Sequence, residues 1–205
     1  MNRPSQREIN FVRFLEERLG VRSDGAHREP TPEQRSTRAT LRRALGKPPG
    51  SVPETYSYVE PWLGPQAAPW QVENFYSIAA LMAWHPVGWH EDDTPQSPTN
   101  LGASFVRLAR TQREFHGEVP AGLERRLVAM LNASQTDLTE HLRHAIGLLK
   151  THEVPVNWVQ LLADLRSWEW SSREVQRRWA YGFWGSAPQD TERQGAVEED
   201  ERDAG

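Results

Sequence analysis

The residues of this chain best suited to binding chemistry are arginines that lie outside the apolar face of amphipathic segments. At about 100° per residue along a helix, residues 101–113 have one apolar face and one basic face. The apolar face holds Leu101, Phe105 and Leu108, and the basic face holds Arg107, Arg110 and Arg113. A guanidinium is planar, stays charged at working pH and pairs well with phosphate oxygens. Such a row is therefore typical of a surface that binds a polyanion.

Three later segments repeat this arrangement. Their basic residues are Arg125 behind the apolar face and Arg126 flanking it in 123–134, Arg143 and Lys150 on the outer side in 138–150, and Arg173 and Arg177 turned outward in 171–184. The densest basic group lies earlier, where Arg38, Arg42 and Arg43 share one end of a predicted helix. It is either a patch that contacts phosphates or a solvated helix face. The same alternative holds for every outer arginine, because charged residues commonly solvate the outer side of an amphipathic helix.

Few residues favour catalysis or metal binding. His85, His90 and the acids at 91–93 lie close together, but their spacing is not that of a helical zinc motif and the segment resembles a loop. His141 and His144 lie one helical turn apart without accompanying carboxylates, as surface or interface histidines do. The chain has no cysteine and no glycine-rich phosphate loop. We therefore expect no catalytic residue, no metal site and no cofactor.

The charge is unevenly distributed. The formal net charge is −4, but residues 186–205 contain seven acids and two arginines, so this segment alone carries −5. The other 185 residues carry +1, which is far below the basic excess of a typical stand-alone DNA-binding domain. This balance favours a weak binder that acts within a larger assembly.

The sequence predicts an all-α fold of about eight or nine helices in two bundle lobes. Residues 1–84 form an N-terminal helical domain and residues 101–185 a C-terminal bundle. The proline-rich and acidic residues 85–100 form a flexible linker or loop. Residues 186–205 form an acidic disordered tail. No strand alternation is present, and no apolar run approaches the roughly 20 residues that span a membrane. Because the first residues also lack a signal-peptide core, we expect a cytoplasmic protein without membrane contact.

Capping residues predict where several helices begin and end. The first expected helix begins at Ser5 with Glu8 and ends at Gly20, and the second runs from Thr31 with Gln34 to Gly46. Two further helices cover 54–62 and 70–84. Later helices begin at Asn100, at Ser134 with Asp137, and at Ser171 with Glu174. Six of the nine tryptophans belong to or adjoin apolar helical positions, which favours packing: Trp62, Trp70, Trp158, Trp168, Trp179 and Trp184. An exposed one such as Trp89 or Trp170 is an alternative site for base stacking.

Over most of its length the chain resembles the CasB family, the small subunit of the type I-E CRISPR surveillance complex Cascade. The resemblance is carried by Arg42–Arg43 and ETYSYVEPWL, then NLGASFVRLAR, then ERRLVAMLNAS with LTEHLRHAIGLL, and finally VNWVQLLADLRSWEWSSREVQRRWAYGFW. The occurrence of all these segments in this order is specific for the family, whereas no single segment would be.

The resemblance implies an all-helical, two-lobed and non-catalytic protein, present in two copies beside the backbone and large subunits. It implies contact with crRNA, with the target strand and with the displaced non-target strand of the R-loop. The candidate nucleic-acid-binding residues are Arg42, Arg43, Arg125, Arg126 and Arg143, with Arg107 and Arg110 in a matching segment. The chain departs from some relatives in having Asn132 and Gln135 where those have arginine. The alternative function is a helical adaptor between proteins that does not contact nucleic acid.

Overall fold

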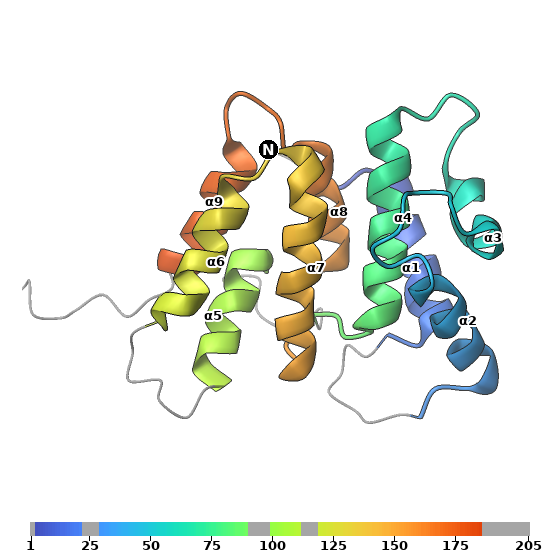
Figure 1. Cartoon of the computed structure of the whole chain (residues 1–205), viewed down its shortest axis with the longest axis horizontal. Helices are drawn as coiled ribbons and strands as arrows, with labels where there is room; N and C mark the ends of the chain where they lie inside the picture. Colours follow the sequence, from blue (N-terminus) through green and yellow to red (C-terminus); the bar gives the residue numbers. More distant parts are fainter. Residues whose placement is uncertain (1–2, 22–28, 90–98, 112–118, 186–205) are drawn as a thin grey trace, which may run out of the picture.

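The computed structural model describes residues 3–21, 29–89, 99–111 and 119–185, and in these ranges the fold is all-α, as predicted (Figure 1). The helices are α1 (Gln6–Leu19), α2 (Pro32–Arg42), α3 (Tyr56–Val59), α4 (Pro69–Trp84), α5 (Leu101–Thr111), α6 (Ala121–Leu131), α7 (Gln135–Thr151), α8 (Trp158–Arg166) and α9 (Glu174–Trp184). Two short 3-10 helices, η1 (Pro53–Thr55) and η2 (Glu60–Trp62), flank α3. None of the helices in these ranges is both long and apolar enough to cross a membrane.

The predicted helix starts are confirmed where a side chain caps the backbone. Ser5 accepts a hydrogen bond from the backbone N–H of Glu8, and the Glu8 carboxylate accepts one from that of Ser5, which begins α1. Gly20 ends this helix in the left-handed conformation, at a φ of 59°. Asn100 and Ser134 cap α5 and α7 in the same way through their side-chain oxygens.

Three predicted boundaries are wrong. Helix α2 ends at Arg42, four residues before Gly46. The single helix predicted over 54–62 is instead η1, α3 and η2 in sequence, and Pro61 has no N–H to continue the helical ladder of α3. Ser171 does not cap α9. This helix begins three residues later, and Arg173 precedes it in the left-handed conformation.

The turn before α9 explains that last difference. Residues 167–173 form successive backbone turns, with the N–H of Trp170 bonded to the Ser167 carbonyl and that of Arg173 to the Trp170 carbonyl. The Gln176 side chain donates to the Trp168 carbonyl, which fastens this turn to the start of the helix. The tertiary fold therefore provides the start of α9 without a capping side chain.

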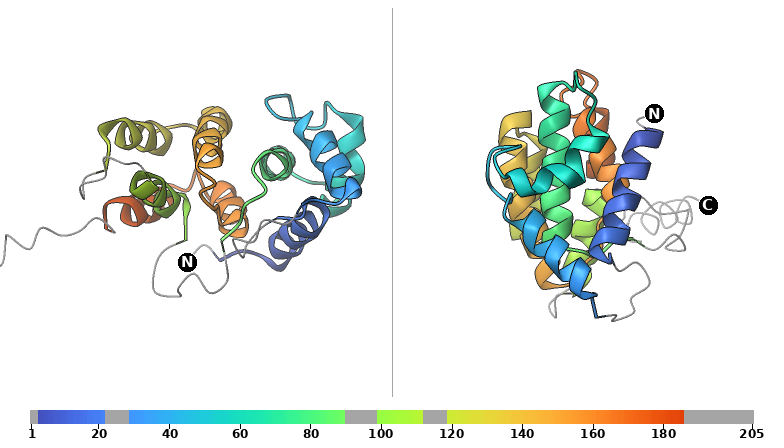
Figure 2. Two further views of the ribbon diagram at one scale, coloured as in Figure 1. Left: turned by 90° about the horizontal axis from the view of Figure 1, so that it is seen from below. Right: turned by 90° about the vertical axis from the view of Figure 1, so that its right-hand side faces the viewer.

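Helix α8 connects the two halves of the chain. It packs against α1 and α4 of the first half, while α9 packs along α5 (Figures 1 and 2). The buried apolar side chains of α1, α4, α5, α7, α8 and α9 belong to one contiguous cluster. Trp158, Trp168 and Trp179 are buried in this core, Trp62 packs partly against it, and Trp70 and Trp184 are exposed. The division into two lobes at residues 85–100 stays a prediction.

The described ends of the predicted linker are bonded to the helical bundle. The His85 ring nitrogen Nε2 lies 2.7 Å from the Val154 carbonyl, and Gly88 pairs with Val156 in an isolated bridge. The Trp158 indole donates to the Val87 carbonyl at 3.1 Å. These ends are therefore part of the packed fold. Residues 90–98, Arg113 of the predicted basic face, and the predicted tail at 186–205 lie outside the described residues.

Candidate nucleic-acid interface

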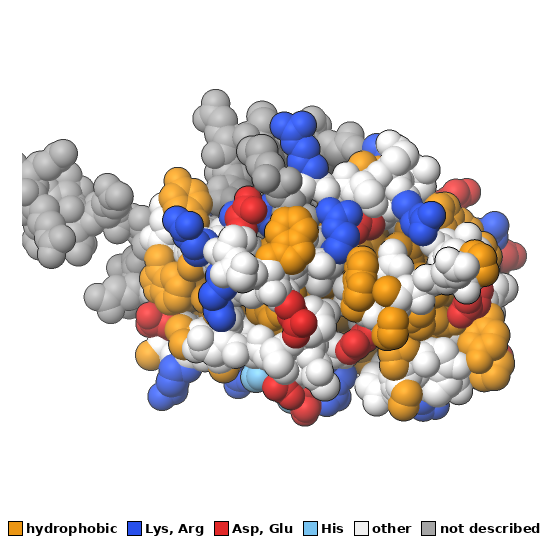
Figure 3. Space-filling view, turned by 90° about the horizontal axis from the view of Figure 1, so that it is seen from above, with side chains coloured by type: hydrophobic (Ala, Val, Ile, Leu, Met, Phe, Trp, Pro, Cys, Tyr) orange, Lys and Arg blue, Asp and Glu red, His pale blue; other side chains and the backbone are white. Residues whose placement is uncertain are grey.

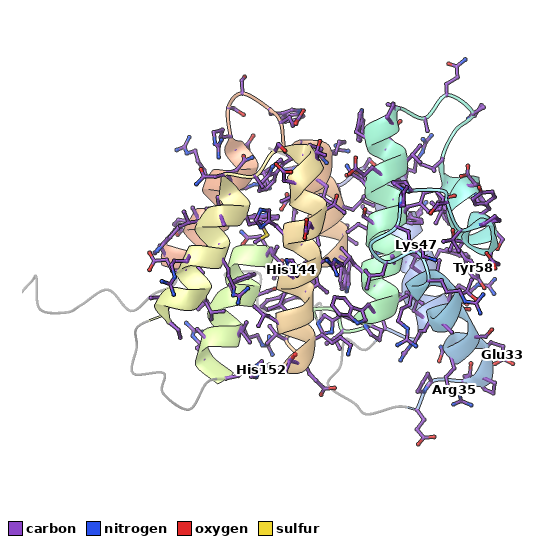
Figure 4. All side chains as sticks on the ribbon, in the orientation of Figure 1. Glu33, Arg35, Lys47, Tyr58, His144 and His152 are labelled. Carbon is purple, nitrogen blue, oxygen red and sulfur yellow. The ribbon has the colours of Figure 1, made fainter. Side chains whose placement is uncertain are left out.

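A basic hollow of about 410 Å³ lies between α6 and α7. Helix α6 turns Leu123, Leu127 and Met130 into the core, which leaves Arg125 and Arg126 exposed on its outer side. Helix α7 contributes two histidines, and Figure 4 shows His144 on the side of α7 that faces α6. The lining residues are Phe105, Gly122, Arg125, Arg126, Ala129, Met130, His141, His144 and Ala145. None of these is acidic.

The charge of this hollow is not neutralised from within the described chain. Arg125 and Arg126 make no ion pair or side-chain hydrogen bond with any described residue. Both guanidinium groups therefore present their donors to solvent. Two fixed cations beside two imidazoles form a site whose chemistry suits phosphate groups, because arginine pairs with phosphate oxygens through two parallel N–H donors.

Arg143 lies on the other side of α7, in a second hollow of about 400 Å³. This hollow faces α4 and the segment after α2, where Lys47 lies (Figure 4). Arg143 is half-buried, and its Nη2 lies 3.9 Å from the Glu140 carboxylate. Glu73 also lines the hollow. Its charge is therefore mixed, unlike that of the hollow between α6 and α7.

The basic group at the end of α2 divides into structural and exposed residues. Arg38 donates to the carbonyl oxygens of Leu19 and Gly20 and so caps the end of α1. Arg43 forms an exposed ion pair with Glu54 at 3.5 Å. Arg42 lines a third hollow of about 400 Å³, together with Arg35, Arg38, Lys150 and Glu153.

Arg107 and Arg110 are exposed on α5, as the helical count predicts. The Arg107 guanidinium lies over the Trp89 ring, 5.0 Å from its centroid. The Trp89 indole also lies within 3.4 Å of the Ser104 hydroxyl. Trp89 is thus half-buried beneath an arginine, and base stacking at this residue stays a prediction. Trp170 is half exposed.

Within the described residues the seven predicted arginines occupy different places. Arg125 and Arg126 share a hollow, and the others are divided between two further hollows, an ion pair and the outer side of α5. The sequence did not reveal that His141 and His144 face this pair, since the pairing of α6 with α7 leaves no signature in either helix. The end of the molecule seen in Figure 3 mixes acidic, basic and hydrophobic side chains, so it offers no band of one sign.

Of the histidine and acidic cluster at 85–93, His85 alone lies in the described part of the chain, and it is buried against Val154. Within the described ranges no three His, Asp or Glu side chains are arranged to hold a metal ion. Gln135 donates its side-chain amide to the side-chain oxygen Oδ1 of Asn74 at 3.1 Å. This residue joins α7 to α4.

Comparison with known proteins identifies the family. Residues 37–184 match the family model of the CRISPR-associated protein Cse2. The CRISPR-associated protein Cse2 of Thermus thermophilus is 31% identical over 166 residues, which cover 80% of this chain and 87% of that protein.

Solved structures agree. The crystal structure of CasB from Thermus thermophilus has a TM-score of 0.64 and 28% identity, and the match covers 87% of this chain and 98% of that chain. A chain in a structure described as a CRISPR RNA-guided surveillance complex shares the fold, with a TM-score of 0.62 and 24% identity over 88% of this chain and 92% of that one. The resemblance inferred from sequence motifs is confirmed.

Proposed function

Because this chain belongs to the Cse2 family of CRISPR-associated proteins, also called CasB, we propose that it is a non-catalytic small subunit of the type I-E Cascade complex. It binds nucleic acid without sequence preference and helps to hold crRNA and target DNA. It also stabilises the displaced non-target strand of the R-loop. Its partners are the backbone and large subunits and a second copy of itself. The occurrence of this fold in a CRISPR RNA-guided surveillance complex supports the proposal.

One observation supports nucleic-acid contact most directly: the pair Arg125 and Arg126 without counter-charges, in a hollow that no described acid lines. A displaced strand of any sequence must be held, so the contacts have to be made to phosphates rather than to base edges. Exchange of a DNA duplex for an RNA–DNA duplex is nearly balanced in free energy. A few phosphate contacts are therefore enough to shift the equilibrium toward the open R-loop.

The test compares R-loop stability in the reconstituted complex with wild-type chain, Arg125→Ala/Arg126→Ala, and Arg143→Ala. The matched control is Arg7→Ala/Arg13→Ala, which removes two exposed charges from α1. We expect the variant Arg125→Ala/Arg126→Ala to assemble normally but to form a less stable R-loop. The control variant should form an R-loop as stable as that of the wild type. In direct binding to single-stranded DNA, the slope of log affinity against log salt should fall by about one per arginine removed.

The alternative function, a helical adaptor without nucleic-acid contact, predicts the opposite result. R-loop stability and the salt slope would then be the same in all four proteins. Binding that depends on Arg143 but not on the α6 pair would instead place the contact in the hollow between α7 and α4. The ion pairs at Arg43 and Arg143 are the features that agree with an adaptor.

A further inference from the structure

The outer face of α9 has an exposed row of one arginine and two aromatic residues. Arg177, Tyr181 and Trp184 are spaced by four and three residues, so they lie one above another on the same face. Tyr181 is 67% exposed and Trp184 is 42% exposed. The opposite face of the helix is fully used for packing, since Val175, Trp179 and Phe183 are buried. The exposed row therefore has no role in the core.

The Trp184 ring is held in a defined position. Its indole Nε1 donates to the Glu124 carboxylate of α6 at 3.3 Å. The Phe183 ring meets it edge to face, at a centroid distance of 5.0 Å and an angle of 84°. A ring that is fixed at its edges and exposed on its surface loses little conformational entropy when a planar group stacks on it.

This row and the basic hollow are both next to α6, on different sides of that helix. Long side chains connect α9 to one edge of α6 at both ends, through Trp184 to Glu124 and through Arg173 to the Leu131 carbonyl. Val128 lies on that same edge, between these two contacts, and is 40% exposed. Arg125 is one helical turn from Val128 and faces the hollow.

We infer that Tyr181 and Trp184 form a stacking platform for the bases of a single-stranded nucleic acid, with Arg177 beside them for a phosphate. The inference rests on the proposed function and extends it, because it assigns the bases of the strand to α9 and its phosphates to the α6 hollow. Every base has a flat aromatic face, so stacking tolerates any sequence. In a duplex these faces are covered by neighbouring base pairs, so the platform selects a single strand.

A nucleic acid fits this row better than a protein partner does. A stable protein interface buries about 800 Å² on each partner, with an apolar centre. The row offers only two aromatic rings and Val128 beside a guanidinium, with the Glu124 carboxylate at its edge. Alternation of positive charge with aromatic faces is characteristic of proteins that bind single strands.

The test measures affinity for a dye-labelled single strand of mixed sequence, and for the matching duplex, over a series of salt concentrations. Tyr181→Ala/Trp184→Ala should weaken single-strand binding about tenfold or more at every salt concentration. The salt slope should stay unchanged, since no phosphate contact is removed, and duplex binding should not change. Tyr181→Phe/Trp184→Phe keeps an aromatic face at both positions and should lose less single-strand affinity than the alanine variant.

Tyr56→Ala/Trp70→Ala is the matched control, because it removes an exposed tyrosine and an exposed tryptophan from the other half of the chain. Circular dichroism verifies that each variant is folded. Unchanged single-strand affinity, or an equal loss for single strand and duplex, would overturn the inference. So would normal single-strand binding combined with failure to join the complex, which would make the row a protein interface.

The two proposals fail in different ways. If the α6 hollow does not bind phosphates, Arg125→Ala/Arg126→Ala keeps the wild-type salt slope while the aromatic variant still loses affinity. If the platform does not bind bases, the arginine variant alone changes binding. A wild-type chain that binds neither single strand nor duplex overturns both.

Discussion

Asp164 shows how a single buried carboxylate joins two helices. Its Oδ1 accepts hydrogen bonds from Gln160 Nε2 at 2.7 Å and from Arg178 Nη2 at 2.6 Å. Its Oδ2 accepts one from the Trp179 indole, also at 2.6 Å. Burial raises the pKa of this carboxyl, and the three donors oppose the rise. The contact between α8 and α9 therefore depends on donors that compensate a charge removed from water.

Asp164→Asn should lower the free energy of unfolding by about 3 kcal/mol. An amide offers one acceptor oxygen to three donors and leaves the Arg178 guanidinium without its counter-charge. Urea unfolding measures the loss, and Glu17→Gln at an exposed position of α1 is the control, with a change below about 0.5 kcal/mol. Equal stability of Asp164→Asn and the wild type would show that the donors do not act on a carboxylate.

Arg38 and Arg42 are one turn apart on α2 but have different roles. Arg38 satisfies two carbonyl oxygens at the end of α1, at 2.7 and 2.9 Å, whereas Arg42 is exposed. We expect Arg38→Gln to destabilise the fold by about 1–2 kcal/mol. Arg42→Gln should change stability by less than about 0.5 kcal/mol. Thermal unfolding of the two variants separates a structural arginine from an exposed one, and equal losses would contradict the assignment.

At the scale of elements, α5 and α9 approach so closely that two glycines are required. A Cβ on Gly102 would lie 2.0 Å from the carbonyl oxygen of Trp179, and one on Gly182 would lie 2.3 Å from the Asn100 side-chain oxygen. Asn100 also donates to the Arg178 carbonyl and so fastens the start of α5 to α9. Neither close approach is visible in the hydrophobic pattern, because a small residue on the apolar face has no distinctive period.

Gly102→Ala should destabilise the protein by about 3 kcal/mol or more, because the backbone of α9 must move to admit the methyl group. Gly122→Ala on α6 is the matched control, since nothing lies within 4 Å of its Cβ position. That variant should gain up to about 1 kcal/mol, as alanine favours the helix over glycine. The urea midpoints of both variants test this prediction. A Gly102→Ala protein as stable as the wild type would show that α5 and α9 lie farther apart at this position than the structure indicates.

Helix ends were predictable where the signal is local. Ser5 with Glu8 and Ser134 with Asp137 cap helices through atoms three residues apart, so the sequence alone contains the whole interaction. The same pattern at Ser171 with Glu174 failed, because Trp168 and Arg173 of this turn donate to the Ala133 and Leu131 carbonyls and so fix the turn before α9. A capping motif predicts a helix start only where no tertiary contact competes with it.

At the scale of the whole molecule, the contiguous core predicts cooperative unfolding. Helix α8 belongs to the second half of the sequence and packs on α1 and α4 of the first. Arg166 of α8 also forms an ion pair with the buried Glu8 carboxylate at 2.9 Å. Loss of either half would therefore expose apolar surface of the other half and break this ion pair.

We expect urea to unfold the chain in one transition. Far-ultraviolet circular dichroism reports all helices, while tryptophan fluorescence is weighted toward Trp158, Trp168 and Trp179 of the second half. The two signals should have coincident midpoints. Separate midpoints would instead support the two bundle lobes that the sequence predicts on either side of residues 85–100.

The sequence by itself determined the helical class, the family, and which arginines lie off the apolar stripes, because helical periodicity and order along the chain are one-dimensional properties. Only the tertiary structure decided that Arg125 and Arg126 face His141 and His144 while Arg38 caps another helix and Arg43 pairs with Glu54. The physical reason is that an outer face becomes a site only through the helix that packs beside it. That neighbour is chosen by the packing of the whole core, including the close contact at Gly102.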